Sequence, residues 1–320
     1  MHGNVSKFEK FKVIIPFTFL IIILSFIYLL FHFNIFTEED HFNASLTNIS
    51  LLLFYNFIFA IKLFCFFKVT CTNPGEIDQA LIEPNTSTKN FCKYCSINRP
   101  DRAKHCEVCK KCFLRWDHHS IWFGNCIGLY NLKMFSLFLF YSTIENLFLV
   151  IVFATKLFVN IVTSEKFTIS CLNMSMFITL GFSFVFLLIS GISFLRQIHL
   201  IMYNLTPIEK QLYDYDIRES IFYSPERYEN LSVIFGSKSY FEWFFPNFIE
   251  NENNNGYRYV KNRNMDNLPI HTPTEDVIEV EKPKISYRDV AEGDITKSID
   301  MSKSFDLGIQ VRKKLQTDEK

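Results

Sequence analysis

The segment from residue 92 to residue 126 constrains the fold more than any other part of the chain. It holds six of the nine cysteines and three of the eight histidines. A structural zinc ion takes four Cys or His ligands in a tetrahedron, commonly with two of them two residues apart. Short paired spacings with interleaved His favour zinc over disulfides, and two sites would use eight ligands. The candidate ligands are Cys92, Cys95, Cys106, Cys109, Cys112, Cys126, His105, His118 and His119.

Four apolar runs predict transmembrane helices. A helix of about 20 residues covers the ~30 Å hydrocarbon core of a bilayer and satisfies its own backbone hydrogen bonds there. The runs span residues 13–33, 50–68, 134–158 and 176–203. The sequence therefore predicts an all-α polytopic membrane protein with a double-zinc domain between the second and third helices. The formal net charge is zero, which gives no indication of nucleic-acid binding.

Polar residues inside two of these runs need an explanation. Lys62 lies near the end of the second run, where a long side chain is expected to extend to the membrane interface. Glu145 and Asn146 lie about halfway along the third run. A carboxylate at that depth is costly, so we expect it to face the interior of the helix bundle. A hydrogen bond between helices is favoured over a functional role.

The distribution of Lys and Arg predicts the orientation in the membrane. The loop 34–49 has no Lys or Arg and the loop 159–175 has only Lys166, whereas residues 68–133 carry ten. Basic residues accumulate in the loops on the cytosolic side. The zinc domain and both termini are therefore expected in the cytosol, and the organelle is left open.

The metal-binding segment resembles the cysteine-rich domain of the DHHC protein S-acyltransferases, a family of palmitoyltransferases. The resemblance rests on the cysteine and histidine spacing together with Arg99-Pro100, Arg102, Asp117, Trp122 and the Asn125 to Gly128 stretch. It implies one zinc ion held by Cys92, Cys95, His105 and Cys112, and a second held by Cys106, Cys109, His119 and Cys126. Spacing alone does not fix this interleaved partition.

The resemblance also implies a reaction. In that family a cysteine attacks the thioester of palmitoyl-CoA or another fatty acyl-CoA, a His acts as base and then acid, and an Asp orients the His. The acyl chain occupies a cavity between the four helices and passes to a cytosolic cysteine of a membrane-associated substrate protein. The matching catalytic positions are Asp117, His118 and Ser120, and Arg102 and Lys104 match the basic region near the CoA phosphates.

The sequence departs from the family pattern close to this chemistry. Ser120 stands where the family has its nucleophilic cysteine, and Ile121 replaces the proline that follows. Residues 72–76 resemble the family's DPG motif, with Asn73 in place of Asp, and a simple turn explains them. Residues 206–209 resemble its TTxE motif, with Pro207 in place of the second Thr. We therefore expect an S-acyltransferase with weak or absent activity.

Two alternatives remain open. A pseudoenzyme would bind acyl-CoA or a partner acyltransferase without turnover, and a Ser-dependent thioesterase or O-acyltransferase ranks last. A serine hydroxyl ionises far less readily than a thiol and needs concerted proton removal by its base. Cys71, near the cytosolic interface, is a candidate stand-in acyl acceptor.

The resemblance extends over about residues 10–245. Together with the apolar runs and the polar, Asn-rich composition beyond residue 246, it divides the chain into six expected segments. They are a cytosolic N-terminus (1–12), the first two transmembrane helices (13–68), the zinc domain (69–133), the last two helices (134–203), a cytosolic segment with membrane-interface aromatic residues (204–245) and a disordered tail (246–320).

Overall fold

The structure, a computed structural model, describes residues 7–36, 46–78, 91–163, 171–213, 227–236 and 239–247. All of them belong to one compact unit, Met1–Asn267. The predicted tail from residue 248 onward lies outside the described residues.

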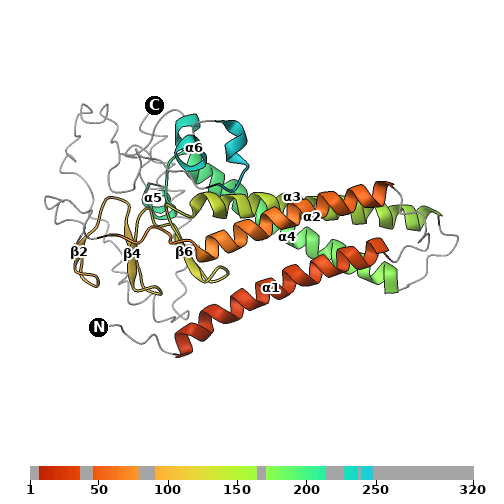
Figure 1. Cartoon of the computed structure of the whole chain (residues 1–320), viewed down its shortest axis with the longest axis horizontal. Helices are drawn as coiled ribbons and strands as arrows, with labels where there is room; N and C mark the ends of the chain where they lie inside the picture. Colours follow the sequence, from red (N-terminus) through yellow and green to blue (C-terminus); the bar gives the residue numbers. More distant parts are fainter. Residues whose placement is uncertain are drawn as a thin grey trace, which may run out of the picture. The chain divides into compact units, whose positions relative to one another are not determined.

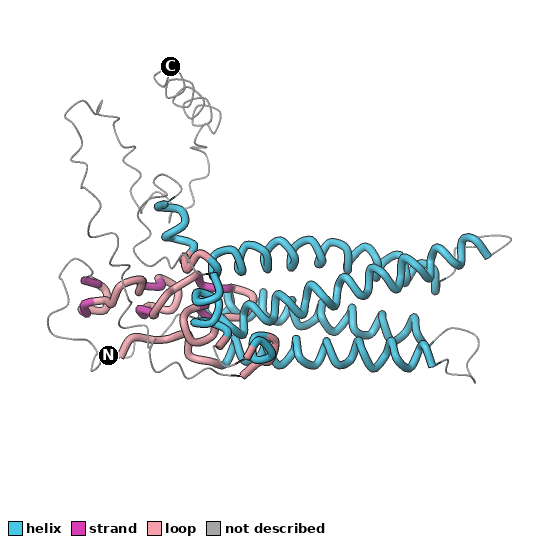
Figure 2. Tube along the Cα trace, turned by 90° about the horizontal axis from the view of Figure 1, so that it is seen from above, coloured by secondary structure: helices cyan, strands magenta, loops and turns pink. Residues whose placement is uncertain are grey.

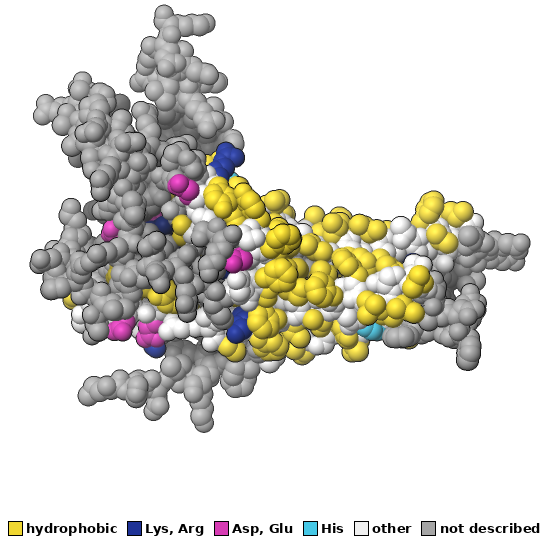
Figure 3. Space-filling model, turned by 45° about the horizontal axis from the view of Figure 1, so that its top comes forward, with side chains coloured by type: hydrophobic (Ala, Val, Ile, Leu, Met, Phe, Trp, Pro, Cys, Tyr) yellow, Lys and Arg dark blue, Asp and Glu magenta, His cyan; other side chains and the backbone are white. Residues whose placement is uncertain are grey.

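Four long helices form the bulk of this unit. They are α1 (Lys7–Phe36), α2 (Leu46–Cys71), α3 (Leu132–Thr163) and α4 (Cys171–Met202). Helix α3 packs against both α2 and α4, and α1 packs against α4 (Figures 1 and 2). Each is long and apolar enough to cross a membrane, and hydrophobic side chains cover the face of the helices seen in Figure 3. The protein is a multi-pass integral membrane protein, as predicted. Helices α1, α2 and α3 extend beyond both ends of the predicted runs, and α4 begins five residues earlier and ends at Met202.

Three short β-hairpins lie between α2 and α3. They pair β1 (Phe91–Cys92) with β2 (Ile97–Asn98), β3 (Lys104–Cys106) with β4 (Lys111–Phe113), and β5 (His118–Ser120) with β6 (Asn125–Ile127). The chain is mostly helical, as expected, but no sequence pattern predicted these hairpins. Strands of two or three residues are too short to show the period-two alternation from which strands are recognised.

Backbone hydrogen bonds join the hairpins to the end of α2. The predicted turn at 72–76 is confirmed: Asn73 Oδ1 accepts hydrogen bonds from the backbone N–H groups of Gly75 and Glu76, at 2.9 and 2.8 Å. Gly75 has φ +109°, a conformation that favours glycine. Leu114 N–H then donates to Gly75 O at 2.8 Å. The turn therefore holds the zinc domain directly against the membrane helices.

Asn125 strengthens this connection. Its Nδ2 group donates to the carbonyls of Val69, Thr70 and Thr72, at 2.9, 3.2 and 2.9 Å. The last carbonyls of a helix have no partner within the helix. A side chain from β6 therefore satisfies the end of a membrane helix.

In the part of the chain after α4 that the structure describes there are three short helices: α5 (Pro207–Tyr213), α6 (Arg227–Phe235) and the 3₁₀ helix η3 (Tyr240–Trp243).

Hydrogen bonds from polar side chains join this C-terminal segment to the helix bundle. Asn230 Nδ2 donates to Met202 O at 2.8 Å. Lys133 Nζ, buried at the start of α3, donates to Phe235 O and Glu242 O at 3.0 and 2.8 Å. The segment is therefore an integral part of the unit. Placement of its aromatic residues at the headgroup level stays a prediction.

The structure corrects the expectation for Lys62. Its side chain is 3% exposed and forms a buried ion pair with Glu145 of α3. The ammonium lies 4.7 Å from the centre of the Phe59 ring, one turn toward the N-terminus of α2. A helical side chain tilts toward the N-terminus of its helix, so Lys62 points into the bundle and away from the nearer helix end. Glu145 accordingly faces the bundle interior, as expected.

Candidate active site and metal centres

Two clusters of three cysteines and one histidine lie in the zinc domain. Within each cluster the candidate ligand atoms lie within 4.8 Å of one another. The first cluster contains Cys92, Cys95, His105 and Cys112, and the second contains Cys106, Cys109, His119 and Cys126. The structure thus brings together the two groups that the family resemblance implies.

The spacing of the ligand atoms fits a tetrahedral metal. In the first cluster His105 Nδ1 lies 3.7, 3.2 and 3.7 Å from the sulfurs of Cys92, Cys95 and Cys112. Zinc bonds of about 2.3 Å to sulfur and 2.0–2.1 Å to nitrogen give tetrahedral edges of roughly 3.5–3.8 Å. The donor set and its dimensions are therefore consistent with two structural zinc sites.

Strand pairing explains why the ligand sets interleave. His105 lies opposite Cys112 in the β3–β4 hairpin, and His119 lies opposite Cys126 in the β5–β6 hairpin. Paired residues share a face of a hairpin, whereas successive residues point to opposite faces. Cys106 therefore turns away from its neighbour His105 and joins the next cluster. Each cluster combines a Cys-x2-Cys turn with a His–Cys pair from the following hairpin.

The thiols of the second cluster have opposing pKa shifts. Hydrogen bonds from Cys109 and Cys126 hold the pKa of Cys106 well below its usual range. Hydrogen bonds to Cys106 and Cys109 raise the pKa of Cys126 above its usual range. Several thiolates crowded together repel one another, and a divalent cation bound between them removes this conflict. Trp116 Nε1 donates to Cys126 Sγ at 3.4 Å, a contact that supports a sulfur ligand.

Strand β5 carries a candidate metal ligand on one face and two candidate catalytic residues on the other. His119 points toward the second cluster, so its neighbours His118 and Ser120 point to the opposite face. Both line a cavity between the helices. Ser120 is buried, whereas the side chain of His118 is 42% exposed. A single short strand therefore directs one face to the second cluster and the other to the cavity.

Asp117 holds His118 in a defined orientation. Its Oδ1 lies 2.6 Å from His118 Nδ1. A carboxylate only accepts hydrogen bonds, so Nδ1 carries the proton and Nε2 is left as a base. Gln197 Nε2 of α4 donates to Asp117 Oδ2 at 3.4 Å. Sequence reasoning missed Gln197, although a polar residue within an apolar run was a signal.

The cavity is mostly apolar and has a volume of about 460 Å³. All four long helices line it, with aromatic and aliphatic side chains such as Ile23, Phe138 and Phe186. Lys62 and Glu145 also line it. Its size and composition suit the hydrocarbon part of an amphipathic ligand.

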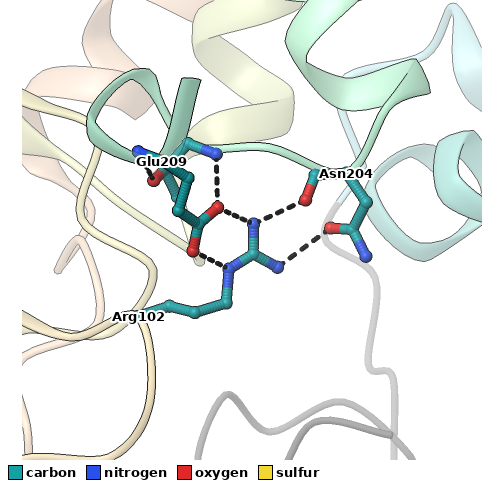
Figure 4. Close-up of polar contacts among 4 residues, drawn as sticks. Arg102, Asn204 and Glu209 are labelled. Carbon is teal, nitrogen blue, oxygen red and sulfur yellow. Dashed lines mark hydrogen bonds and ion pairs between the residues drawn. The ribbon is translucent and has the colours of Figure 1, made fainter. Parts of the chain in front are cut away.

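Arg102 connects the zinc domain to the segment after α4 (Figure 4). Its Nε and Nη2 donate to the two oxygens of the Glu209 carboxylate, at 2.8 and 2.9 Å. Its Nη1 donates to Asn204 Oδ1 at 2.9 Å, and Nη2 also donates to Asn204 O at 2.8 Å. Arg102 and Asn204 have φ values of 65° and 48°, which non-glycine residues adopt at a cost of ~1–3 kcal/mol. This forked ion pair therefore maintains two strained turns.

The Thr206 to Glu209 stretch forms a helix cap. Thr206 N–H donates to Glu209 Oε2 at 2.7 Å, and Glu209 N–H donates to Thr206 Oγ1 at 3.3 Å. This reciprocal pattern is a capping box at the start of α5. Pro207 occupies the first helical position, where its missing N–H costs nothing. The replacement of the second Thr is thus compatible with the local fold.

The two predicted CoA-binding residues have different surroundings. The Arg102 side chain is 1% exposed and engaged with Glu209, so its contacts support the domain interface. Lys104 begins β3 and is partly exposed. Contact of either residue with CoA stays a prediction.

Replacing Arg102 by alanine is expected to lower the free energy of unfolding by about 2–3 kcal/mol, because hydrogen bonds to a charged group are lost and the mostly buried Glu209 carboxylate keeps no cation. Lysine in its place should recover only part of this loss, since it cannot donate in a bidentate fork. Thermal unfolding in lipid nanodiscs measures both effects. Lys93→Ala, which changes an exposed cation of the same domain, serves as the control. An Arg102→Ala variant as stable as this control would contradict the role given to the ion pair.

Comparison with known proteins agrees with this geometry. Residues 85–214 match the model of the DHHC palmitoyltransferase family. The chain is 27% identical over 235 residues to the probable protein S-acyltransferase 12 of Arabidopsis thaliana, covering 68% of this chain and 79% of that protein. It is 34% identical over 131 residues to the palmitoyltransferase PFA3 of Debaryomyces hansenii, which covers 41% of this chain and 32% of that protein. Residues 85–214 therefore form a domain of the DHHC palmitoyltransferase family.

Proposed function

We propose that this protein binds fatty acyl-CoA as an S-acyltransferase of its family and that Ser120 leaves its turnover weak or absent. The observation that carries the proposal is the position of His118 and Ser120. Both line the same apolar cavity, and Asp117 holds the His118 ring with Nε2 available as a base. The acyl chain would enter the cavity while the CoA part stays outside.

The first step would transfer the acyl group to the protein. His118 Nε2 takes the proton of the Ser120 hydroxyl while Oγ forms a bond to the thioester carbonyl carbon. The carbon–sulfur bond then breaks, and CoA leaves as a thiol with the proton from His118. In the second step His118 would take the proton of a substrate cysteine while its sulfur attacks the carbonyl carbon of the oxyester. The bond from that carbon to Ser120 Oγ would then break, and His118 would return the proton to regenerate the Ser120 hydroxyl.

Serine hinders both steps. A cysteine has a pKa near 8.5 that a neighbouring His lowers further, so a thiolate is available near neutral pH. A serine hydroxyl provides no comparable fraction of ionised nucleophile near neutral pH, so it depends on proton removal during the attack. The oxyester is also a weaker acyl donor than a thioester. The metal sites would fix the shape of the domain without taking part in either step.

The orientation with both termini and the zinc domain in the cytosol belongs to the same proposal. It is supported by the excess of Lys and Arg in residues 68–133 over the loops 34–49 and 159–175. The acyl acceptors would then be cysteines of membrane-associated proteins on the cytosolic side.

A pseudoenzyme is the second candidate. It is supported by the intact ligand clusters and cavity together with the altered nucleophile position. Such a protein would present bound acyl-CoA, or its own surface, to a partner acyltransferase.

Covalent labelling of the purified protein in nanodiscs separates these outcomes. The native protein, Ser120→Ala and Ser120→Cys are incubated with tagged lauroyl-CoA and, separately, tagged palmitoyl-CoA. Ser120→Cys is expected to gain an acyl label that neutral hydroxylamine removes, at least ~100-fold above the native protein, because a thiolate replaces a neutral hydroxyl.

The amount of label on Ser120→Ala measures the acylation in this experiment that does not depend on Ser120. A native label that Ser120→Ala abolishes and that resists hydroxylamine would identify Ser120 as a working nucleophile and contradict weak turnover. If Ser120→Cys folds with its metals bound but takes no label, the proposed acyl-CoA site itself is wrong.

A further inference from the structure

The exposed face of α4 changes from aliphatic to basic near the end of the helix that is joined to the zinc domain through Arg102. Leu188, Ile192 and Leu195 lie on one stripe of the helix and are exposed. Arg196 continues this stripe with His199, and both are exposed. Since α4 is long and apolar enough to cross a membrane, the aliphatic part of the stripe faces lipid chains. The basic side chains then lie at the level of the lipid headgroups.

Helix α6 brings a third basic side chain to this place. Asn230 of α6 donates to Met202 O and so holds α6 against the end of α4. The Arg227 guanidinium of α6 lies 5.6 Å from the ring centre of Tyr203, and its Nη2 donates to Tyr203 Oη at 3.5 Å. The ring centre of His199 lies 4.6 Å from that of the same tyrosine. Basic side chains from two helices therefore gather around Tyr203.

The basic cluster, defined as Arg196, His199 and Arg227, has no carboxylate partner in the part of the chain that the structure describes. The buried Arg102, in contrast, is paired with Glu209. Both arginines of the cluster keep their charge at every physiological pH. Uncompensated guanidinium groups on one surface repel each other, and a bound anion removes this repulsion. The cluster therefore fits a ligand with more than one negative charge.

We propose that the basic cluster binds the phosphomonoester headgroup of an anionic phospholipid, such as phosphatidic acid or a phosphoinositide. A phosphomonoester carries about −1.5 to −2 charge at pH 7, more than the phosphodiester of other phospholipids. A planar guanidinium donates two parallel hydrogen bonds to phosphate oxygens. The lipid would lie in the leaflet next to the zinc domain.

The neighbouring surface favours a lipid over a free phosphate ion. The acyl chains of a bound lipid would lie along the exposed stripe from Leu188 to Leu195. Tyr228, next to Arg227, is also exposed, and its ring centre lies 5.6 Å from that of Trp243 in a stacked arrangement. Aromatic side chains of this kind are typical of the headgroup region. A free phosphate would contact only the charged part of this surface.

The cluster lies on a different face of α4 from the candidate active site. Gln197, between the two basic residues of α4 in the sequence, donates to Asp117 Oδ2. At about 100° per residue, Arg196 and His199 are turned by about 100° and 160° from Gln197 around the helix axis. A lipid on the basic cluster would therefore leave the cavity open, and its binding does not depend on acyl transfer at Ser120.

Lipid titration of the purified full chain in detergent micelles tests the site. Native mass spectrometry measures the fraction of protein that carries phosphatidic acid, phosphatidylinositol 4-phosphate, phosphatidylserine or phosphatidylcholine. We expect the Kd of the two phosphomonoester lipids to be at least ~10-fold lower than that of phosphatidylserine. Inorganic phosphate and glycerol 3-phosphate, added as competitors of phosphatidic acid, should bind at least ~10-fold more weakly than the lipid because they have no acyl chains.

Variants of the cluster locate the binding. Arg196→Gln with Arg227→Gln removes both permanent charges and should raise the Kd for phosphatidic acid at least ~10-fold. Arg196→Gln alone leaves the contact between Arg227 and Tyr203 in place and should show part of this loss. Arg196→Lys with Arg227→Lys keeps the charge without the planar fork, so it should recover affinity but not the preference over phosphatidylserine. Lys93→Gln with Lys110→Gln removes two exposed cations of the zinc domain and should leave the Kd unchanged.

Equal Kd values for phosphatidic acid and phosphatidylserine, or equal losses in the cluster and zinc-domain variants, would mean only general attraction of anionic lipids to a basic surface and would overturn the proposal. A phosphate competitor as strong as the lipid would overturn the lipid as the ligand. Zinc content and thermal unfolding equal to those of the native protein show that a variant with weaker binding is folded. A loss of headgroup preference confined to the cluster variants supports the inference.

Discussion

Lys62→Met is expected to lower the free energy of unfolding by about 3–5 kcal/mol, because it leaves the Glu145 carboxylate buried without its cation. Both side chains are nearly inaccessible, at 3% and 2% exposure. Glu145→Met should lower the free energy of unfolding by a similar amount, since it leaves the Lys62 ammonium buried without its anion. Thermal unfolding in nanodiscs provides the measurement.

The double variant Lys62→Met with Glu145→Met is the informative comparison. Replacing a buried ion pair by apolar side chains of similar volume is often neutral or stabilising, so the double variant should be close to the native protein. Lys111→Met, which breaks an exposed pair with Glu76, should cost about 1 kcal/mol or less. Additive losses in the double variant would show that the two charges do not stabilise each other.

Loss of a metal ligand is expected to have the second large effect. Cys126→Ser removes a ligand of the second cluster, and Cys112→Ser removes one of the first. Each should lower the bound zinc from two ions per chain to about one or fewer and unfold the zinc domain. Structural zinc contributes ~10–16 kcal/mol of binding free energy in small domains whose folding depends on it. Elemental analysis and limited proteolysis of the purified protein measure the two effects.

Cys71→Ser is the matched control for these variants, because Cys71 is exposed and lies outside both clusters. Its zinc content and proteolysis should equal those of the native protein. Full zinc content in either cluster variant would mean that its cysteine is not a ligand.

The helical part of the fold was predictable because uninterrupted apolar runs have few structural outcomes in a membrane. The position of Lys62 was not. Its place near the end of a run suggested the interface, whereas the buried carboxylate of Glu145, 83 residues later, holds it inside the bundle. Sequence distance conceals such a pair until the packing of α2 against α3 is known.

The candidate site was less completely predictable from the sequence than the long helices. The spacing of Cys and His predicted eight metal ligands, but only the family resemblance divided them between two sites. The register of the β3–β4 and β5–β6 hairpins gives the physical reason for this division. The resemblance also placed Arg102 near CoA, whereas its guanidinium contacts Glu209 and Asn204. The Gln197 contact with Asp117 does not follow from any local pattern.

The hydrogen bonds of Asn125 have a consequence for how substrates reach the site. Asn125 holds the end of α2, its neighbour Cys126 belongs to the second cluster, and its partner across the hairpin is Ser120. The domain therefore cannot swing away from the membrane without breaking the hydrogen bonds between Asn125 and the end of α2. Under the proposed function, the acyl-CoA and the accepting cysteine must both come to a fixed entrance, and diffusion along the membrane surface becomes the main route of delivery.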